Sequence, residues 1–501
     1  MRAIASAVVL LLVVLAATGL EAETYHVRQD GTGDFASIQA AIDASLDGDE
    51  IVVHPGTFYE NIHFDGKNIV LRCTDPEDKD VVASTIIDGA SSDSVVRFSG
   101  VESGTCRLMG FTITKGRSYY GGGIDGGEYQ LPHTHASIEN CVITSNEGME
   151  GGGVAFCDGE IVNCEITNNR YGGMGCWEGG GLFLCNGNIT GCYIAGHSAY
   201  GGAGLYGCIG RISDCVITDN SSDYGAGVCG GVHGLFNCLI FGNTSAGVRN
   251  YQGPIGNCTF FRNSVAAIDI CDSNVTNCVI WGNNFSGDDQ LLDTVPPSHC
   301  CIQNWTGSGE GNISDDPLLV SGPLGGYYLD PNSPCVNTGS VSADEAGLSD
   351  RTTQADGTPD TGVVDMGYHY RLPEQNTHVE VICALNSEEF APGDVIQGFM
   401  GIENRGDDIE VDVYAVIVRP NGFLLSLTND GFADGAWPCF SDLVLPSGFA
   451  AWPETMFELT IPAGIEQGSY SYFAAACRPG EGPSGVISID EWQFEIRAAA
   501  I

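Results

Sequence analysis

The residues best suited to chemistry are a lysine, an arginine and an aspartate that lie close together in the repetitive middle of the chain. Lys115 is the only lysine between residues 105 and 305, Arg117 lies two positions on, and Asp125 follows. Proton removal next to a uronate carboxylate needs a cation that neutralises the carboxylate and a basic side chain that takes the proton. If the chain carries a catalytic site, these three residues are its best candidates; the alternative is a solvated charged loop.

Five tyrosines and one tryptophan form a second candidate site. Each tyrosine precedes a glycine cluster, and the tryptophan shares a loop with one of them. Equivalent positions in stacked units would form a row on one face, where rings could stack on a sugar chain. The alternative is that the rings simply pack over the glycine bends. The predicted substrate-binding residues are Tyr119, Tyr120, Tyr171, Trp177, Tyr200 and Tyr224.

Three aspartates around a glycine-containing turn form the third candidate. Asp356, Asp360 and Asp365 supply carboxylate oxygens, the ligands that Ca²⁺ prefers. They predict a calcium site, and a solvated Asp-Gly turn is the alternative.

A sequence repeat must position these candidates. The motif Asn-Cys-x-Ile, or a close variant, recurs with its cysteines 23, 28, 23, 23, 20 and 20 residues apart. Repeats of this length indicate stacked coils. The motif cysteines are Cys141, Cys164, Cys192, Cys215, Cys238, Cys258 and Cys278.

Variation within the motif indicates which side chains point inward. The residue after the cysteine varies and should face solvent, whereas the cysteine and the following Ile or Phe barely change and should be buried. This two-residue period is that of a strand. A second polar series follows three residues later, suits left-handed bends and could stack into a ladder. Its members are Asn146, Asn169, His197, Asn220, Asn243, Asn263 and Asn283.

Glycine clusters add further bends, and no helical period occurs in the repeats. The pattern predicts an all-β fold, a parallel β-helix in which each strand pairs with the coils before and after it. A sandwich of many strands is the alternative, but it would not produce one motif at nearly constant spacing.

The 21 cysteines allow two interpretations. Neighbouring coils lie about 4.8 Å apart, whereas bonded cysteines need Cβ atoms about 3.8 Å apart. We therefore expect mostly free, stacked thiols. A disulfide framework stays open, because an exported chain would favour it.

The Phe260-Phe-Arg-Asn263 element and the Gly-Gly-x-Val/Ile/Leu clusters resemble the repeats of polymorphic outer membrane proteins. They also resemble right-handed parallel β-helix proteins of bacterial surfaces with the pectin-lyase-like fold. The resemblance covers about residues 105–305. It implies a right-handed β-helix but no single activity, since the group includes adhesins, passenger domains and polysaccharide-degrading enzymes.

Both flanks of the repeats carry resemblances of their own. Residues 23–64 are assigned to an N-terminal cap and the first coil, and they resemble the opening of pectin methylesterases. Within them, Ser37 is predicted to N-cap a helix over residues 37–44 that covers the open end of the first coil. Residues 65–305 hold the repeats. Residues 306–372 resemble the segment that closes many surface β-helices before diverse C-terminal anchors.

The marks of two enzyme groups with this fold are absent from the sequence. It lacks the Asp-Phe-Ile-Phe-Gly and Gly-Arg-Pro-Trp motifs of pectin methylesterases and the Gly-His-Gly motif of polygalacturonases. We therefore expect a non-catalytic protein that binds a polysaccharide or cell-surface glycan, or acts in adhesion. A polysaccharide lyase or related enzyme is the alternative.

Residues 1–22 read as a signal peptide, with an uncleaved anchor as the alternative. We expect a secreted or cell-surface monomer, with association to an outer membrane as one form of attachment. No later segment is apolar enough to span a bilayer. The net charge of −45 disfavours nucleic acid as a partner.

Residues 376–501 read as about seven strands separated by turns, which predicts an immunoglobulin-like β-sandwich. Its three cysteines, Cys383, Cys439 and Cys477, allow one disulfide without indicating the pair.

Overall fold

The computed structural model describes residues 22–127, 129–130, 132–171, 179–284, 289–322, 325–372, 379–405, 409–420, 424–428, 431–434, 437–477 and 486–497. The predicted signal peptide therefore lies outside the described residues, except for Ala22. The chain divides into two compact units between Leu372 and Pro373. Within the described residues, none of the helices has the length and apolar character needed to cross a membrane.

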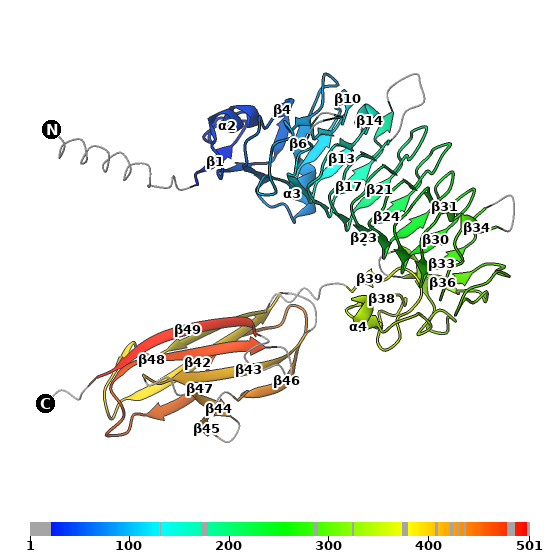
Figure 1. Ribbon diagram of the computed structural model, residues 1–501. Coiled ribbons are helices and arrows are strands. Elements are labelled where there is room, and N and C mark those ends of the chain that lie inside the picture. Colours follow the sequence, from blue (N-terminus) through cyan, green and yellow to red (C-terminus); the bar gives the residue numbers. More distant parts are fainter. Residues whose placement is uncertain are drawn as a thin grey trace, which may run out of the picture. The chain divides into compact units, whose positions relative to one another are not determined.

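The first unit is a parallel β-helix (Figure 1), which confirms the predicted fold class. Its coils pass in turn through three long sheets, and strands of neighbouring coils pair in parallel, as β13 pairs with β9 and β17. Sheet A and sheet B have eleven strands each and sheet C has ten. Three strands in the turns between sheets B and C add a short fourth sheet.

Sheet A consists of β1 (Thr24–Val27), β2 (Glu50–Val53), β5 (Val70–Cys73), β8 (Arg107–Met109), β12 (Ser137–Glu139), β16 (Ile161–Val162), β20 (Ile189–Thr190), β23 (Ile212–Ser213), β26 (Leu235–Phe236), β29 (Ile255–Gly256) and β32 (Val275–Thr276). Sheet B consists of β3 (Gly56–Phe58), β6 (Thr85–Asp88), β9 (Thr112–Thr114), β13 (Val142–Thr144), β17 (Glu165–Thr167), β21 (Tyr193–Ala195), β24 (Val216–Thr218), β27 (Leu239–Phe241), β30 (Thr259–Phe261), β33 (Val279–Trp281) and β35 (Cys301–Ile302). Sheet C consists of β4 (Ile62–His63), β7 (Val96–Arg97), β11 (Ile124–Asp125), β15 (Val154–Ala155), β19 (Leu182–Phe183), β22 (Leu205–Tyr206), β25 (Val228–Cys229), β28 (Val248–Arg249), β31 (Ile268–Cys271) and β34 (Leu291–Thr294). The short sheet consists of β10 (Arg117–Tyr120), β14 (Glu147–Glu150) and β18 (Arg170–Tyr171).

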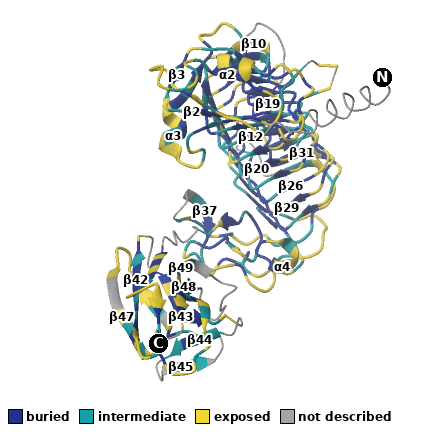
Figure 2. Ribbon diagram, turned by 90° about the vertical axis from the view of Figure 1, so that its left-hand side faces the viewer, coloured by how far each residue is buried: buried dark blue, intermediate teal, exposed yellow. Residues whose placement is uncertain are grey.

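The predicted alternation holds along sheet B. Cys141 and Ile143 are buried in the core of the β-helix, while Val142 between them is partly exposed. Figure 2 shows buried strands inside the β-helix and exposed turns around them. In the last coils the position after the cysteine is buried as well, at Leu239 and Val279. The prediction that this position faces solvent is wrong in the last coils, because a later part of the chain covers them.

The second polar series forms a buried ladder in the turns between sheets B and C. The N–H and Nδ2 of Asn146 both donate to Oδ1 of Asn169, at 2.9 and 3.0 Å. Nδ2 of Asn146 also donates to the carbonyl of Ile113 at 3.0 Å. Each coil repeats this pattern with small changes, so buried backbone groups find partners. The left-handed bend falls one residue earlier, for example at Asp219 (φ 53°), and not on the ladder residue as predicted.

The cysteines are free, as expected: all twenty in the described residues lack a disulfide. Each motif thiol donates to a carbonyl two residues back, as Cys164 does to Val162 at 3.3 Å. Burial raises the pKa of the Cys157 thiol to about 12. Buried thiols of this kind are weak nucleophiles, so the cysteines pack as core side chains.

The open first coil is covered by α2 (Ile38–Ala44). Ser37 caps this helix by accepting from the N–H of Ala40 at 3.3 Å, and Ile38, Ala41 and Ile42 are buried. The predicted capping helix is confirmed. A second short helix, α3 (Lys79–Ser84), lies against the start of sheet B, where the Thr112 hydroxyl donates to the Val82 carbonyl at 3.0 Å.

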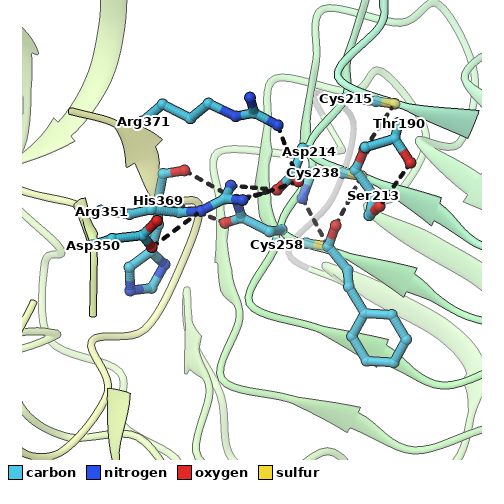
Figure 3. Close-up of polar contacts among 12 residues, drawn as sticks. Thr190, Ser213, Asp214, Cys215, Cys238, Cys258, Asp350, Arg351, His369 and Arg371 are labelled. Atoms are coloured by element: carbon cyan, nitrogen blue, oxygen red, sulfur yellow. Dashed lines mark hydrogen bonds and ion pairs between the residues drawn. The ribbon is translucent and has the colours of Figure 1, made fainter. Parts of the chain in front are cut away.

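Residues 306–372, named here the closing segment, fold back along the last coils. They contain β36 (Leu319–Gly322), β37 (Gly325–Leu329), α4 (Ala343–Ala346), β38 (Arg351–Thr352) and β39 (Tyr370–Arg371). Figure 3 shows Arg351 and Arg371 pointing at Asp214 on the β-helix. The Arg351 guanidinium donates to both carboxylate oxygens, with Nη2–Oδ2 at 3.1 Å. This ion pair joins residues 137 positions apart.

Replacing Asp214 with asparagine is expected to lower the free energy of unfolding by about 2 kcal/mol, because Arg351 loses its carboxylate in a site that is 15% exposed. Asparagine is the usual residue at this motif position, so the bend should survive. Chemical denaturation and hydrogen exchange of the closing segment check this. Asp219→Asn in the same coil is the matched control and should have little effect. Equal stability of D214N and the native protein would contradict the role of the ion pair.

The second unit is a β-sandwich of two sheets around one apolar core. Its described residues form ten strands where the sequence predicted about seven; the short strands β41, β45 and β46 are additional. Cys383, Cys439 and Cys477 are free. The strands are β40 (Val379–Leu385), β41 (Glu389–Phe390), β42 (Val395–Asn404), β43 (Ile409–Val418), β44 (Leu424–Thr428), β45 (Gly431–Asp434), β46 (Phe440–Leu445), β47 (Ala450–Thr460), β48 (Gly468–Cys477) and β49 (Val486–Ile496).

Candidate functional site

The structure places the three predicted catalytic residues in three separate ion pairs. Lys115 Nζ lies 2.6 Å from Asp88 Oδ2, and Arg117 Nε lies 3.2 Å from Glu147 Oε1. The hydrogen bond with Asp88 raises the pKa of Lys115, which keeps its ammonium group protonated. A general base needs the opposite shift. The geometry therefore does not support proton abstraction by Lys115.

Asp125 is the third predicted catalytic residue, and it lies on the outer face of sheet C. Its Oδ2 is 3.3 Å from Arg97 Nε, and its Oδ1 accepts from the N–H of Gly127 at 3.2 Å. The side chain is 11% exposed. Burial raises the pKa of Asp125 to about 6, despite the nearby guanidinium. Asp125 can therefore exchange a proton near neutral pH, the property of a general acid.

The tyrosines occupy the turns between sheets B and C, but they form two groups and not one row. Tyr119 and Tyr120 have ring centroids 4.6 Å apart, and Tyr200 and Tyr224 have theirs 5.2 Å apart. Two coils lie between the groups: the first has no tyrosine in this turn, at residues 145–153, and in the second Tyr171 is out of line with Tyr120. Tyr120 is level with Glu150, whereas Tyr171 is level with Gly148, two positions away. Trp177 and the side chain of Tyr171 lie outside the described residues.

Three of these tyrosines are accessible. Tyr119 is 47% exposed, Tyr200 is 37% exposed and Tyr224 is 45% exposed. Tyr120 instead packs against Phe156, with ring centroids 5.0 Å apart. For Tyr120, the structure therefore favours a packing role over the predicted role in sugar binding. The Arg249 guanidinium lies over the Tyr224 ring at 5.2 Å. We name Tyr119, Tyr200 and Tyr224 the exposed tyrosines.

Sequence reasoning missed an aromatic cluster on the outer face of sheet C. Phe156 and Phe183 are buried outside the main core, with centroids 5.7 Å apart, and Phe183 stacks on Tyr206 at 5.8 Å. Tyr129, 52% exposed, lies over Phe156 at 6.1 Å. Phe183 and Tyr206 directly follow the buried leucine after each glycine cluster, so alignment of the clusters could have found them. Of the predicted tyrosines, Tyr120 packs against this cluster, and Tyr119 lies against Tyr120.

A polar groove of about 560 Å³ lies beside this face, where sheet C turns into sheet A. Its lining includes His135, Asp158, Glu160, Asn186 and Asn188. Asp158 already accepts from Asn186 Nδ2 at 2.7 Å, and its Oδ1 lies 3.1 Å from the His133 ring. The groove offers hydrogen-bonding groups at one level per coil, which suits an extended polar ligand.

The three aspartates predicted to bind calcium do not form a ligand set. Asp356 lies in an exposed turn, and its carboxylate accepts from the N–H of Thr358. Asp360 is buried, with Oδ2 2.8 Å from His369 Nε2, and Asp365 accepts from the N–H of Asn337 at 2.6 Å. Protein donors thus occupy at least one oxygen of each of these carboxylates. The part of the chain that the structure describes holds no group of three or more His, Cys, Asp or Glu that could bind a metal ion.

Residues 123–315 match the family model for a right-handed β-helix region. A comparison with curated protein sequences finds no match. Solved structures with weak likeness include the alkylpurine DNA glycosylase AlkC of Pseudomonas fluorescens bound to DNA (15% identity, 24% of this chain, 31% of that chain, TM-score 0.17). A second is the sporulation control protein Spo0M of Bacillus subtilis (12% identity, 24% of this chain, 50% of that chain, TM-score 0.16). A third is a β-glucosidase of Listeria innocua in complex with isofagomine (16% identity, 28% of this chain, 19% of that chain, TM-score 0.17).

The chain covers half or less of each of these three proteins, and TM-scores this low carry no argument about fold or function. The family match and the three parallel sheets agree with each other. The chain therefore contains a right-handed parallel β-helix.

Proposed function

We propose that this is an exported, non-catalytic β-helix protein that binds a polysaccharide or cell-surface glycan through the exposed tyrosines. The observation that carries the proposal is the accessibility of Tyr119, Tyr200 and Tyr224 in equivalent turns, Tyr200 and Tyr224 in neighbouring coils and Tyr119 three coils before Tyr200. Accessible aromatic rings with polar tips suit sugar rings, which have one apolar face and a polar edge. The polar groove at the other edge of sheet C supplies further hydrogen bonds to a chain that crosses this sheet.

Charge narrows the class of glycan. The net charge of −45 repels polyanions such as uronate polymers, so a neutral polysaccharide is the better ligand. This also weighs against a lyase acting on uronates. We also propose that the protein is exported, is secreted or attached to the cell surface, and is related to polymorphic outer membrane proteins.

The combined substitution of Tyr119, Tyr200 and Tyr224 by alanine is expected to weaken binding to a neutral polysaccharide at least about tenfold, or about 1.4 kcal/mol. Affinity electrophoresis in gels containing neutral or acidic polysaccharides measures this. Tyr193→Ala is the matched control, because Tyr193 is 42% exposed but lies on sheet B. Thermal unfolding verifies that the variants fold. Unchanged retention of the triple variant, or equal loss in Y193A, would contradict the proposal.

A carbohydrate-active enzyme is the second candidate, and the raised pKa of Asp125 is what favours it. The same polysaccharides can be assayed for new reducing ends and for unsaturated products. Cleavage that disappears in Asp125→Asn would favour this candidate over simple binding.

A further inference from the structure

A row of left-handed residues marks the corner between sheets A and B. Each precedes the motif cysteine of its coil, and most are asparagines whose side chains reach the outside of the corner. We name them the corner residues. They are Asn140 (φ 52°), Asn163 (φ 52°), Gly191 (φ 68°), Asp214 (φ 59°), Asn237 (φ 48°), Asn257 (φ 52°) and Asn277 (φ 54°).

In the last coils the corner residues hold the main chain of the closing segment. Asn237 Nδ2 donates to the carbonyl of His369 at 2.9 Å, and the N–H of His369 donates to Asn237 Oδ1 at 2.7 Å. Asn257 Nδ2 reaches the carbonyl of Asp365 at 3.4 Å, and Asn277 Oδ1 accepts from the N–H of Ser340 at 2.9 Å. An amide that donates and accepts at once pairs with a peptide group as a neighbouring strand would.

In the first coils the same corner is open. Asn140 and Asn163 line a groove of about 630 Å³, and the other wall is α3 with the residues before it. Asn163 is exposed, and Asn140 is partly exposed. Nothing in the described residues covers the groove as the closing segment covers Asn237.

The remaining lining shows which side chains would fit. Val142, Val82 and Pro76 provide apolar contacts along the groove. Its charged residues are Glu77, Lys79, Asp80 and Glu165, three acids and one base. The groove therefore favours an extended chain with aliphatic and basic side chains. The Arg351–Asp214 pair shows the same match of charges farther along the corner.

We propose that this groove binds an extended polypeptide segment of a partner protein by the peptide-pairing geometry seen at Asn237. The bound segment would continue the line of the closing segment toward the first coil. This site is separate from the exposed tyrosines, which lie in the turns between sheets B and C, so it does not depend on glycan binding.

A synthetic peptide of residues 363–371, which already uses this geometry within the chain, is the probe. Fluorescence anisotropy with the full chain should show saturable binding below about 1 mM. The double substitution Asn140→Gly and Asn163→Gly should weaken it at least about tenfold. Glycine removes the amides but keeps the left-handed bend, as Gly191 does naturally.

Asn250→Gly is the matched control, because Asn250 is an exposed left-handed residue (φ 53°) at another turn. It should leave binding unchanged. Absence of saturable binding to the native chain would overturn the proposal. So would equal binding by the double glycine variant, or equal binding of a peptide with the same residues in scrambled order.

Discussion

Replacing Asn220 with alanine is expected to lower the free energy of unfolding by about 3–5 kcal/mol. Asn220 has no exposed surface. Its Oδ1 accepts from the N–H of His197 at 3.1 Å, and its Nδ2 donates to the carbonyl of Ile194 at 3.2 Å and to Asn243 Oδ1 at 3.1 Å. Alanine leaves an N–H and a carbonyl without partners in the core and opens a small cavity. Both effects act in the same direction.

Chemical denaturation of the purified protein measures this change. Asn188→Ala is the matched control, because Asn188 is exposed on the opposite side of its coil and makes one long contact, from the N–H of Arg211 at 3.3 Å. Its effect should stay within about 0.5 kcal/mol. Similar losses in the two variants would show that the ladder amides have no special role in stacking the coils.

Acidification between about pH 6.5 and 4 is expected to remove about 3 kcal/mol of stability through one residue, His197. His197 replaces asparagine in the ladder and is 1% exposed. In the Nε2–H tautomer it donates to the carbonyl of Ile166 at 2.9 Å, and its Nδ1 accepts from the N–H of Asn169 at 3.1 Å. Burial lowers the pKa of His197 to about 4 from its ordinary 6.5.

The sign follows from where the proton binds. Below pH 6.5 the unfolded chain takes up a proton that the folded chain refuses until about pH 4, so stability is complete above pH 6.5 and falls as the pH drops. Unfolding curves of His197→Asn should lose this component, because asparagine fills the ladder position without titrating. His233→Asn, at an exposed histidine, should keep it. If H197N and the native protein lose stability in parallel, His197 is not the titrating group.

The repeat itself could be predicted because it is local and redundant. Cys141 and Ile143 belong to one short strand, and six further copies report the same inside and outside positions. The capping helix could also be predicted, since Ser37 and three apolar residues lie within one segment. The ladder could be predicted because each of its residues lies five positions after the motif cysteine of its coil.

Contacts between distant parts of the chain could not be predicted. Lys115 meets Asp88 one coil earlier, and nothing in the repeat marks Asp88 as its partner. Burial of Val279 depends on the closing segment, whose return path is set by contacts such as the pair between Arg351 and Asp214. The division of the tyrosines into two groups reflects the turn at residues 145–153, which has no tyrosine, and the position of Tyr171, which is level with Gly148 and not with Glu150 as Tyr120 is.

Hydrogen exchange with and without a neutral oligosaccharide tests the proposed glycan site most directly. The account predicts slower exchange in the turns that carry the exposed tyrosines, at residues 117–122, 198–204 and 221–227, and unchanged exchange in sheet B around Tyr193. Protection confined to other regions, or none at a saturating concentration of every neutral glycan that the protein retains, would contradict it.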